Sequence, residues 1–150
     1  MKELSKIQKR DQLLDDLEVA LLHLPRVEIP ITHRFTEGMY IREMRIPAGT
    51  MLTSMVHKTE HPFVISEGAI KISSDHEGSV ILEAPYTGIT KPNTRRAGHA
   101  LTDVVWTTFH ATTETDVEKI CEEILEPHSL SHLQLEDQKF IPQYKESLPE

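Results

Sequence analysis

The hexapeptide HKTEHP, residues 57–62, contains the two residues whose type and spacing most directly suggest chemistry. Neutral imidazole nitrogens are good ligands for divalent Zn, Fe, Ni or Mn, and His57 and His61 lie four positions apart. In one straight strand their rings would stand about 13 Å apart, at roughly 3.3 Å per residue, so no single ion could contact both. A shared metal site therefore requires the chain to bend between them.

The residues between the two histidines favour a turn over a helix. Residues 58–60 lie between two strand-like segments, and Pro62, which lacks an N–H, suits the first position of the second strand. The facing ends of adjacent strands are about 5 Å apart between backbones, so both rings could reach one ion. A zinc-protease helix would instead need the pattern HExxH, and Pro62 would break such a helix. We therefore expect His57 and His61 to share a site formed by a hairpin.

The segment VVWTTFHAT, residues 104–112, supplies the candidate for a third ligand. Side chains alternate between the two faces of a strand, so Trp106, Thr108 and His110 share one face. If Arg96 faces the interior and a hairpin turn follows, His110 lies one step beyond Arg96 on the inward face. We expect His110 to be the third ligand, and His99 is the alternative if a bulge reverses its face. An ion with open coordination positions could then activate water or a substrate.

Three residues are candidates for binding a small anionic substrate. The planar guanidinium of Arg96 could hold two oxygens of an anion, and Tyr40 and Trp106 could line a pocket. Each residue also has a structural alternative, because aromatic side chains inside a β-structure are usually part of the core. Arg96 could equally pair with an acid of the chain, the candidates being Glu43, Glu67 and Asp103.

The elements that must position these residues are predominantly strands. Residues 4–23 carry apolar side chains three and four apart, which predicts an amphipathic helix, and Pro25 and Pro30 then predict an extended link. From residue 39 to residue 112, seven or eight short strands are separated by turns rich in Gly, Pro and Asp. This pattern is typical of an all-β sandwich or barrel.

A second helix is predicted after the strands. Thr115 and Glu118 have the spacing of a capping box, and Pro127 would end a helix over about residues 116–125. The polar remainder is interpreted as a tail on the barrel or on a neighbouring subunit. We therefore divide the chain into a helix and link (1–38), a β core (39–112), and a helix and tail (113–150).

Composition limits the classes of function. The chain has 150 residues, a net charge of −8 and a pI of about 5.6, which argues against nucleic-acid binding and fits one acidic domain. Cys121 is the single cysteine, so no intramolecular disulfide can form and a reducing compartment fits. Charges throughout the N-terminal segment argue against a signal peptide and a membrane span. We expect a cytoplasmic protein.

The histidine segment resembles the first motif of the cupin barrels. That motif is G, five residues, HxH, three or four residues, Glu, six residues and Gly; counting back from Gly68 places His57 on the second histidine and His61 on the metal-binding glutamate. Met55 occupies the first histidine position. The second motif, PxGxxH, aligns with KPNTRR and places Arg96 where the last histidine ligand stands. The resemblance covers residues 39–112 and implies a mostly β, cupin-like double-stranded β-helix (jelly-roll) barrel that binds a divalent metal ion.

The whole pattern also resembles small cupin-type proteins encoded by bacteriophages and prophages, which would place the chain in a host cytoplasm. Three classes of function follow: a metal-dependent enzyme acting on a small anionic substrate, a non-catalytic barrel that binds a small molecule, and a structural or assembly protein. We favour a metal-binding cupin-like protein of unassigned activity. An apolar stripe on the first helix predicts a homo-oligomer, in the simplest case a homodimer, or could cover the outer sheet; its residues are Leu13, Leu14, Leu17 and Leu21.

Overall fold

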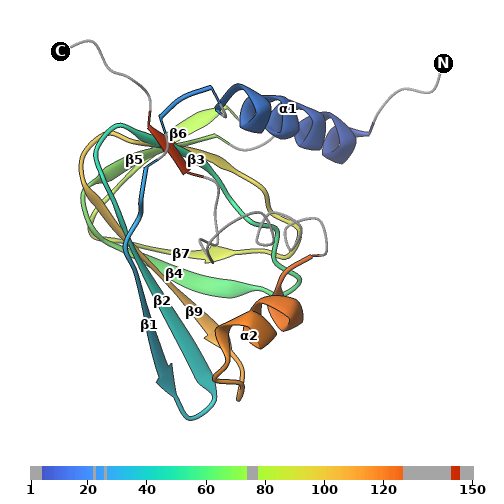
Figure 1. Ribbon diagram of the computed structural model, residues 1–150, viewed down its shortest axis with the longest axis vertical. Helices are drawn as coiled ribbons and strands as arrows, with labels where there is room; N and C mark the ends of the chain where they lie inside the picture. Colours follow the sequence, from blue (N-terminus) through green and yellow to red (C-terminus); the bar gives the residue numbers. More distant parts are fainter. Residues whose placement is uncertain (1–4, 22, 26, 74–77, 127–142, 146–150) are drawn as a thin grey trace.

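The chain folds into two five-stranded antiparallel sheets, with one helix before the strands and another after most of them (Figure 1). The computed structural model describes residues 5–21, 23–25, 27–73, 78–126 and 143–145. The first sheet has the strand order β1-β2-β9-β4-β7, and the second has the order β10-β3-β8-β5-β6. The predicted mostly β fold with two helices is therefore confirmed, although the strands form two separate sheets and not a closed barrel.

The first sheet carries most of the residues that the sequence pattern singled out. The register of β2 against β9 places Tyr40 opposite His110 and Met44 opposite Trp106, so their side chains share the inward face. The strands of this sheet are β1 (Ile31–Thr36), β2 (Met39–Ile46), β9 (Val104–Ala111), β4 (His61–Glu67) and β7 (Tyr86–Thr90).

Strand β1 lies in the segment that was expected to be an extended link. It pairs along its whole length with β2, from Ile31 opposite Met44 to Thr36 opposite Met39. Ile31 and His33 are half-buried while the residues that follow each of them are exposed, so the segment has the alternation of an edge strand. The paired strands therefore begin at residue 31 and not at residue 39.

The second sheet includes a short piece of the C-terminal tail, because the backbone of β10 pairs with β3. Residues 127–142, which the sequence analysis also assigned to the tail, lie outside the described residues. The strands of this sheet are β10 (Gln143–Lys145), β3 (Thr50–Thr53), β8 (Ala97–Ala100), β5 (Ala69–Ser73) and β6 (Ser79–Glu83).

The chain passes repeatedly between the two sheets, and two of these crossings bear on the site. The segment from β3 to β4 carries His57, and Gly68 makes the step from β4 to β5 with φ = +87°. A Cβ at Gly68 would overlap the carbonyl oxygen of Asp103, so both the backbone conformation and the space at this crossing require glycine.

The helix α1 (Lys6–Leu21) lies against the second sheet near β3 (Figure 1). Its observed ends fall within the predicted range. Leu14 and Leu21 are buried, whereas Leu13 is 62% exposed, so part of the apolar stripe covers the sheet. No helix in the described part of the chain is long and apolar enough to cross a membrane.

The helix α2 (Val117–Ile124) places apolar side chains in the core between the sheets. Asp116, and not the predicted Thr115, is the N-cap: its carboxylate accepts a hydrogen bond of 3.0 Å from the backbone N–H of Glu118. Ile120 and Ile124 are buried on the inward side of this helix. This packing fixes the segment that follows α2 beside the histidines.

Candidate metal centre

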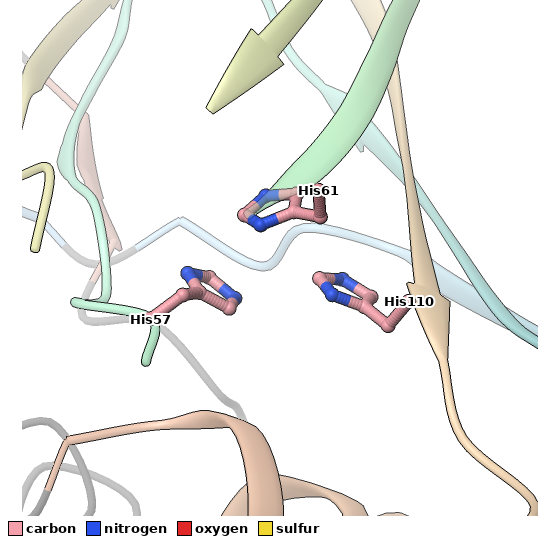
Figure 2. Close-up of side chains that lie close together, drawn as sticks. All are labelled: His57, His61 and His110. Atoms are coloured by element: carbon pink, nitrogen blue, oxygen red, sulfur yellow. The ribbon is translucent and has the colours of Figure 1, made fainter. Parts of the chain in front are cut away.

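The structure brings His57, His61 and His110 together from three different segments. His61 is the first residue of β4, and His110 lies near the end of β9. His57 lies on the crossing from β3 to β4, where its backbone pairs with Leu125 after α2 and its carbonyl oxygen accepts a 3.0 Å hydrogen bond from the N–H of Asn93. Figure 2 shows the three rings directed toward one shared space.

The expected hairpin between His57 and His61 is wrong. Strands β3 and β4 belong to different sheets, so the chain between the histidines passes from one sheet to the other. A sheet crossing bends the chain as strongly as a hairpin would, and for this reason the expected meeting of the two rings is still found. The ring centroids of His57 and His61 are 4.4 Å apart.

The spacing of the three rings suits a common ligand. The ring centroid of His110 lies 5.2 Å from that of His57 and 4.5 Å from that of His61, and one nitrogen from each ring lies within 4.8 Å of the others. Ligands about 2.1 Å from a tetrahedral ion are about 3.4 Å from one another. Inward shifts on the order of 1 Å would therefore bring the most widely separated nitrogens to that distance.

The hydrogen bonds of the rings leave nitrogen atoms available. Nε2 of His110 shares a 2.9 Å hydrogen bond with the Thr108 hydroxyl, and its Nδ1 is buried without a hydrogen-bond partner among the described residues. Nδ1 of His61 lies 3.4 Å from the carbonyl oxygen of Thr59. A buried nitrogen with no partner is costly unless something binds it, and a metal ion would satisfy it.

All three imidazoles are held in the neutral form. Burial lowers the pKa of His57 to about 2, with further lowering from His61, His110 and the charge of Arg42. Burial, the neighbouring His61 and the charge of Arg42 lower the pKa of His110 to about 3. Burial has the largest effect on His61 and lowers its pKa below the usual value; the Thr59 carbonyl opposes this shift, and the charge of Arg96 adds a smaller lowering. Neutral rings keep the lone pairs that a metal ion requires.

The histidines line a cavity of about 110 Å³ that also contains two arginines. Arg42 follows Tyr40 by two positions on β2 and therefore lies on the same inward face. The described residues that line the cavity include no Asp or Glu. Arg42 was not among the residues predicted for the site, although the same alternation that places Tyr40 on the inward face also places Arg42 there.

Arg96 stands on the cavity wall, beside β7. Its Nη1 donates a 3.3 Å hydrogen bond to the hydroxyl of Thr90, and its guanidinium lies 5.5 Å from the centroid of the Phe63 ring. The alternative pairing with Glu43, Glu67 or Asp103 is not found: Glu43 pairs with arginines on β1 and β2, and Asp103 accepts from the N–H of Ala48. The guanidinium of Arg96 is therefore available to an anion in the cavity.

The residue before Arg96 faces the opposite way. Arg95 is 2% exposed and binds the carboxylates of Asp15 at 2.7 Å and Glu18 at 3.0 Å, both on α1. The two arginines thus have different roles, Arg95 holding the helix outside and Arg96 contributing to the wall inside.

The other candidate residues have well-defined positions. Tyr40 lines the cavity, its ring stacks on His110 at 5.8 Å, and its hydroxyl lies 2.6 Å from Nδ1 of His33. Trp106 lines the cavity and stacks on Phe63 at 4.5 Å. Met55, at the first histidine position of the motif, is buried and also lines the cavity.

His99 is not part of this group. It lies on β8 opposite Met51 and Lys71, and it lines a separate groove beneath α1. Between the two alternatives for a third member of the histidine group, the structure places His110 beside the pair and His99 on the other side of the sheet.

Comparison with solved structures identifies the fold. A protein from Klebsiella pneumoniae with a double-stranded β-helix domain matches with a TM-score of 0.50 and 14% identity, over 64% of this chain and 90% of that chain. The fold is a double-stranded β-helix. A weaker match to the cupin fold is an RmlC-like protein from Methanocaldococcus jannaschii, with a TM-score of 0.48 and 11% identity over 57% of this chain and 82% of that chain.

Another weaker match to the cupin fold is a cupin superfamily protein from Desulfitobacterium hafniense, with a TM-score of 0.48 and 10% identity over 61% of this chain and 84% of that chain. No protein-family model and no curated protein sequence matches the chain. These identities are too low to carry a function across, so the site itself must supply the functional argument.

Proposed function

We propose that this protein binds one divalent metal ion through His57, His61 and His110, and a small anionic molecule beside that ion. The observation that supports this most strongly is the convergence of three neutral imidazoles, one of which has a buried nitrogen without a hydrogen-bond partner among the described residues. Zn, Fe, Ni and Mn all accept imidazole nitrogen, so the ligand set does not select one of them.

The electrostatics of the cavity support an anionic second ligand. The charge of Arg42 lowers the pKa of His57 and His110, and the charge of Arg96 lowers the pKa of His61, so both guanidinium groups act on the histidines. A bound divalent ion would add positive charge to the same region. An anion is the ligand that this field stabilises.

The residues of the chain itself would bind and orient this ligand. Burial raises the pKa of Tyr40 to about 12, and burial holds the pKa values of His57 and His110 far below neutral. These groups are therefore poor proton donors and acceptors near pH 7, where general acid–base catalysis needs a matched pKa. A bound ion with an open position would supply Lewis-acid chemistry.

Elemental analysis tests the metal site. The purified protein, incubated with Zn, Fe, Ni or Mn and then desalted, should retain about one equivalent of ion. The variants His57→Ala, His61→Ala and His110→Ala should lose it, and His99→Ala, outside the cavity, should keep it. Circular dichroism of each variant checks that the fold is intact. If the parent protein retains none of the four ions, the metal proposal is wrong.

Three finer expectations from the sequence remain predictions. A relationship to phage-encoded cupins and a cytoplasmic location follow only from the sequence resemblance and composition. The predicted homo-oligomer is tested by sedimentation, for which a strictly monomeric profile would contradict it. The alternative roles of a non-catalytic binder or an assembly protein are separated by the metal analysis and by a search for turnover.

A further inference from the structure

The cavity changes from polar to apolar along the strands of the first sheet. Along β2 the inward side chains are, in order, Tyr40, Arg42, Met44 and Ile46, and all four line the cavity. Along β9 the inward side chains opposite the first three of these are, in the same order, His110, Thr108 and Trp106. Both strands thus run from a charged and polar end to an apolar end.

The second sheet shows the same gradient. The backbone of Ser54 and that of Arg96 are hydrogen-bonded to each other at 2.8 Å, and both residues line the cavity near the histidines. In the next inward step Leu52 lies opposite Gly98, and Ile72 lies opposite Gly98 from the other side. We call the region of the histidines and arginines the histidine end. The apolar end is formed by Met44, Ile46, Leu52, Ile70, Ile72 and Trp106.

Gly98 lies in the wall of the apolar end and is packed closely against its aliphatic side chains. A Cβ at this position would lie 3.2 Å from Cδ1 of Ile70, 3.5 Å from Cδ1 of Ile72 and 3.6 Å from Cδ2 of Leu52, so it would point among the apolar side chains. The glycine does not have the positive φ that would exclude other residues. The backbone would therefore accept a larger residue, but this residue would push the Ile70 side chain aside and reduce the space left at the apolar end.

We propose that the ligand of this cavity is an amphiphilic anion, with a compact anionic head at the histidine end and a short apolar tail at the apolar end. This inference rests on the proposed function, because it assigns a chemical class to the anionic molecule of the same site. Sugars and other polyols fit poorly. The side chains that form the apolar end offer a hydroxyl group only the indole N–H of Trp106 and the weakly accepting sulfur of Met44, which Arg42 already contacts, and burying an unpaired hydroxyl is costly.

A chain-length series tests the tail. Acetate, butyrate and hexanoate are titrated calorimetrically into the Zn-loaded protein and into the chelator-treated protein. Each methylene buried at the apolar end should tighten binding about fourfold, or about 16-fold for each pair, until the space is filled. Hexanol and hexylamine are the matched controls for the charge of the head, and both should bind far more weakly than hexanoate. Hexyl phosphate, compared with hexanoate, shows which anionic head the site prefers.

Two variants localise the head and the tail. Arg96→Gln should weaken acetate and hexanoate by the same factor, because it acts on the head alone. Gly98→Val should remove most of the chain-length dependence, measured as the ratio of hexanoate to acetate affinity, with Gly98→Ala as an intermediate control for folding. Affinity that is independent of chain length in the parent protein, or equal affinity for hexanol and hexanoate, would overturn the proposal.

The outcomes separate this proposal from the metal proposal. If no ion is retained but the chelator-treated protein binds longer alkanoates more tightly, the metal site is wrong and the amphiphilic ligand stands. If one ion is retained and chain length has no effect, the metal site stands and the ligand class is wrong. Absence of binding by every anion in both preparations also overturns the ligand class.

Discussion

Acidification of the metal-free protein should remove folding free energy through the buried histidines. Burial holds the pKa of His57 at about 2 and that of His110 at about 3, whereas an imidazole in the unfolded chain has a pKa of about 6.5. Between these values the unfolded state binds protons that the folded state excludes, so stability is full above pH 6.5 and falls as the pH falls below it. Each pH unit below about 6.5 costs about 1.4 kcal/mol per histidine.

From pH 7.5 to pH 5.0 the cost is therefore about 2 kcal/mol for each of the two histidines, or about 4 kcal/mol together. This loss of stability depends little on the pKa values of the two histidines in the folded protein, since both lie well below 5. The lowered pKa of His61 acts in the same direction. A loss of this size is a large fraction of the stability of a typical domain.

Urea unfolding of the chelator-treated protein at pH 7.5, 6.5 and 5.0 measures the effect. Carboxylates also begin to take up protons near pH 5, so the contribution of each histidine to the loss of stability is obtained by comparing the parent protein with a variant that lacks that histidine. His57→Gln and His110→Gln should each reduce the acid-induced loss by about 2 kcal/mol relative to the parent protein. His99→Gln, outside the cavity, is the matched control. If both cavity variants lose as much stability on acidification as the parent, the imidazoles are not held neutral by burial and the electrostatic argument fails.

Three further outcomes are expected. The imidazoles of His57 and His110 are already neutral in the folded protein, so Zn affinity should change less than about threefold between pH 7.5 and 5.5. The affinity is measured by competition with a chelator that is calibrated at each pH. Two imidazoles with ordinary pKa values would lose about 100-fold in affinity, and such a loss would contradict the neutral site. Gly68→Ala should lower the free energy of unfolding by at least about 2 kcal/mol, measured in urea, because it places a Cβ against a backbone carbonyl at a positive φ; an unchanged value would contradict the described crossing. Asp116→Ala should cost about 1 kcal/mol through loss of the N-cap, measured as a lower Tm, whereas Asp116→Asn should restore most of it.

The strands and the histidine group could be predicted from the sequence because both depend on local alternation. The segments MYIREMRI and VVWTTFHA coincide with β2 and β9, and the inward face of β9 correctly placed His110 in the cavity. The alternation of inward and outward side chains along a strand, and the residues that form turns, depend only on a few neighbouring positions of the chain. Local patterns of this kind are what a single sequence shows best.

Features that depend on contacts between distant segments were not predicted. The step from β3 to β4 is a sheet crossing and not a hairpin, because β3 pairs with β8 and β10 and β4 pairs with β7 and β9. Arg42 was overlooked because a charged residue in an alternating strand is normally taken to face solvent, and only the assembled cavity shows where it points. The strand β1 escaped notice because two prolines precede it and its partner lies beyond the turn.

The adjacent Arg95 and Arg96 link the exterior of the molecule to its interior. Through Asp15 and Glu18, Arg95 ties the helix α1 to the same short stretch of backbone that presents Arg96 to the cavity. Asn93, two residues earlier, contributes its N–H to the carbonyl of His57 and its own carbonyl to the guanidinium of Arg10 on α1. If the cavity binds the proposed ligand, truncation of α1, or high salt that weakens its ion pairs, is expected to change the ligand affinity even though α1 lies outside the cavity.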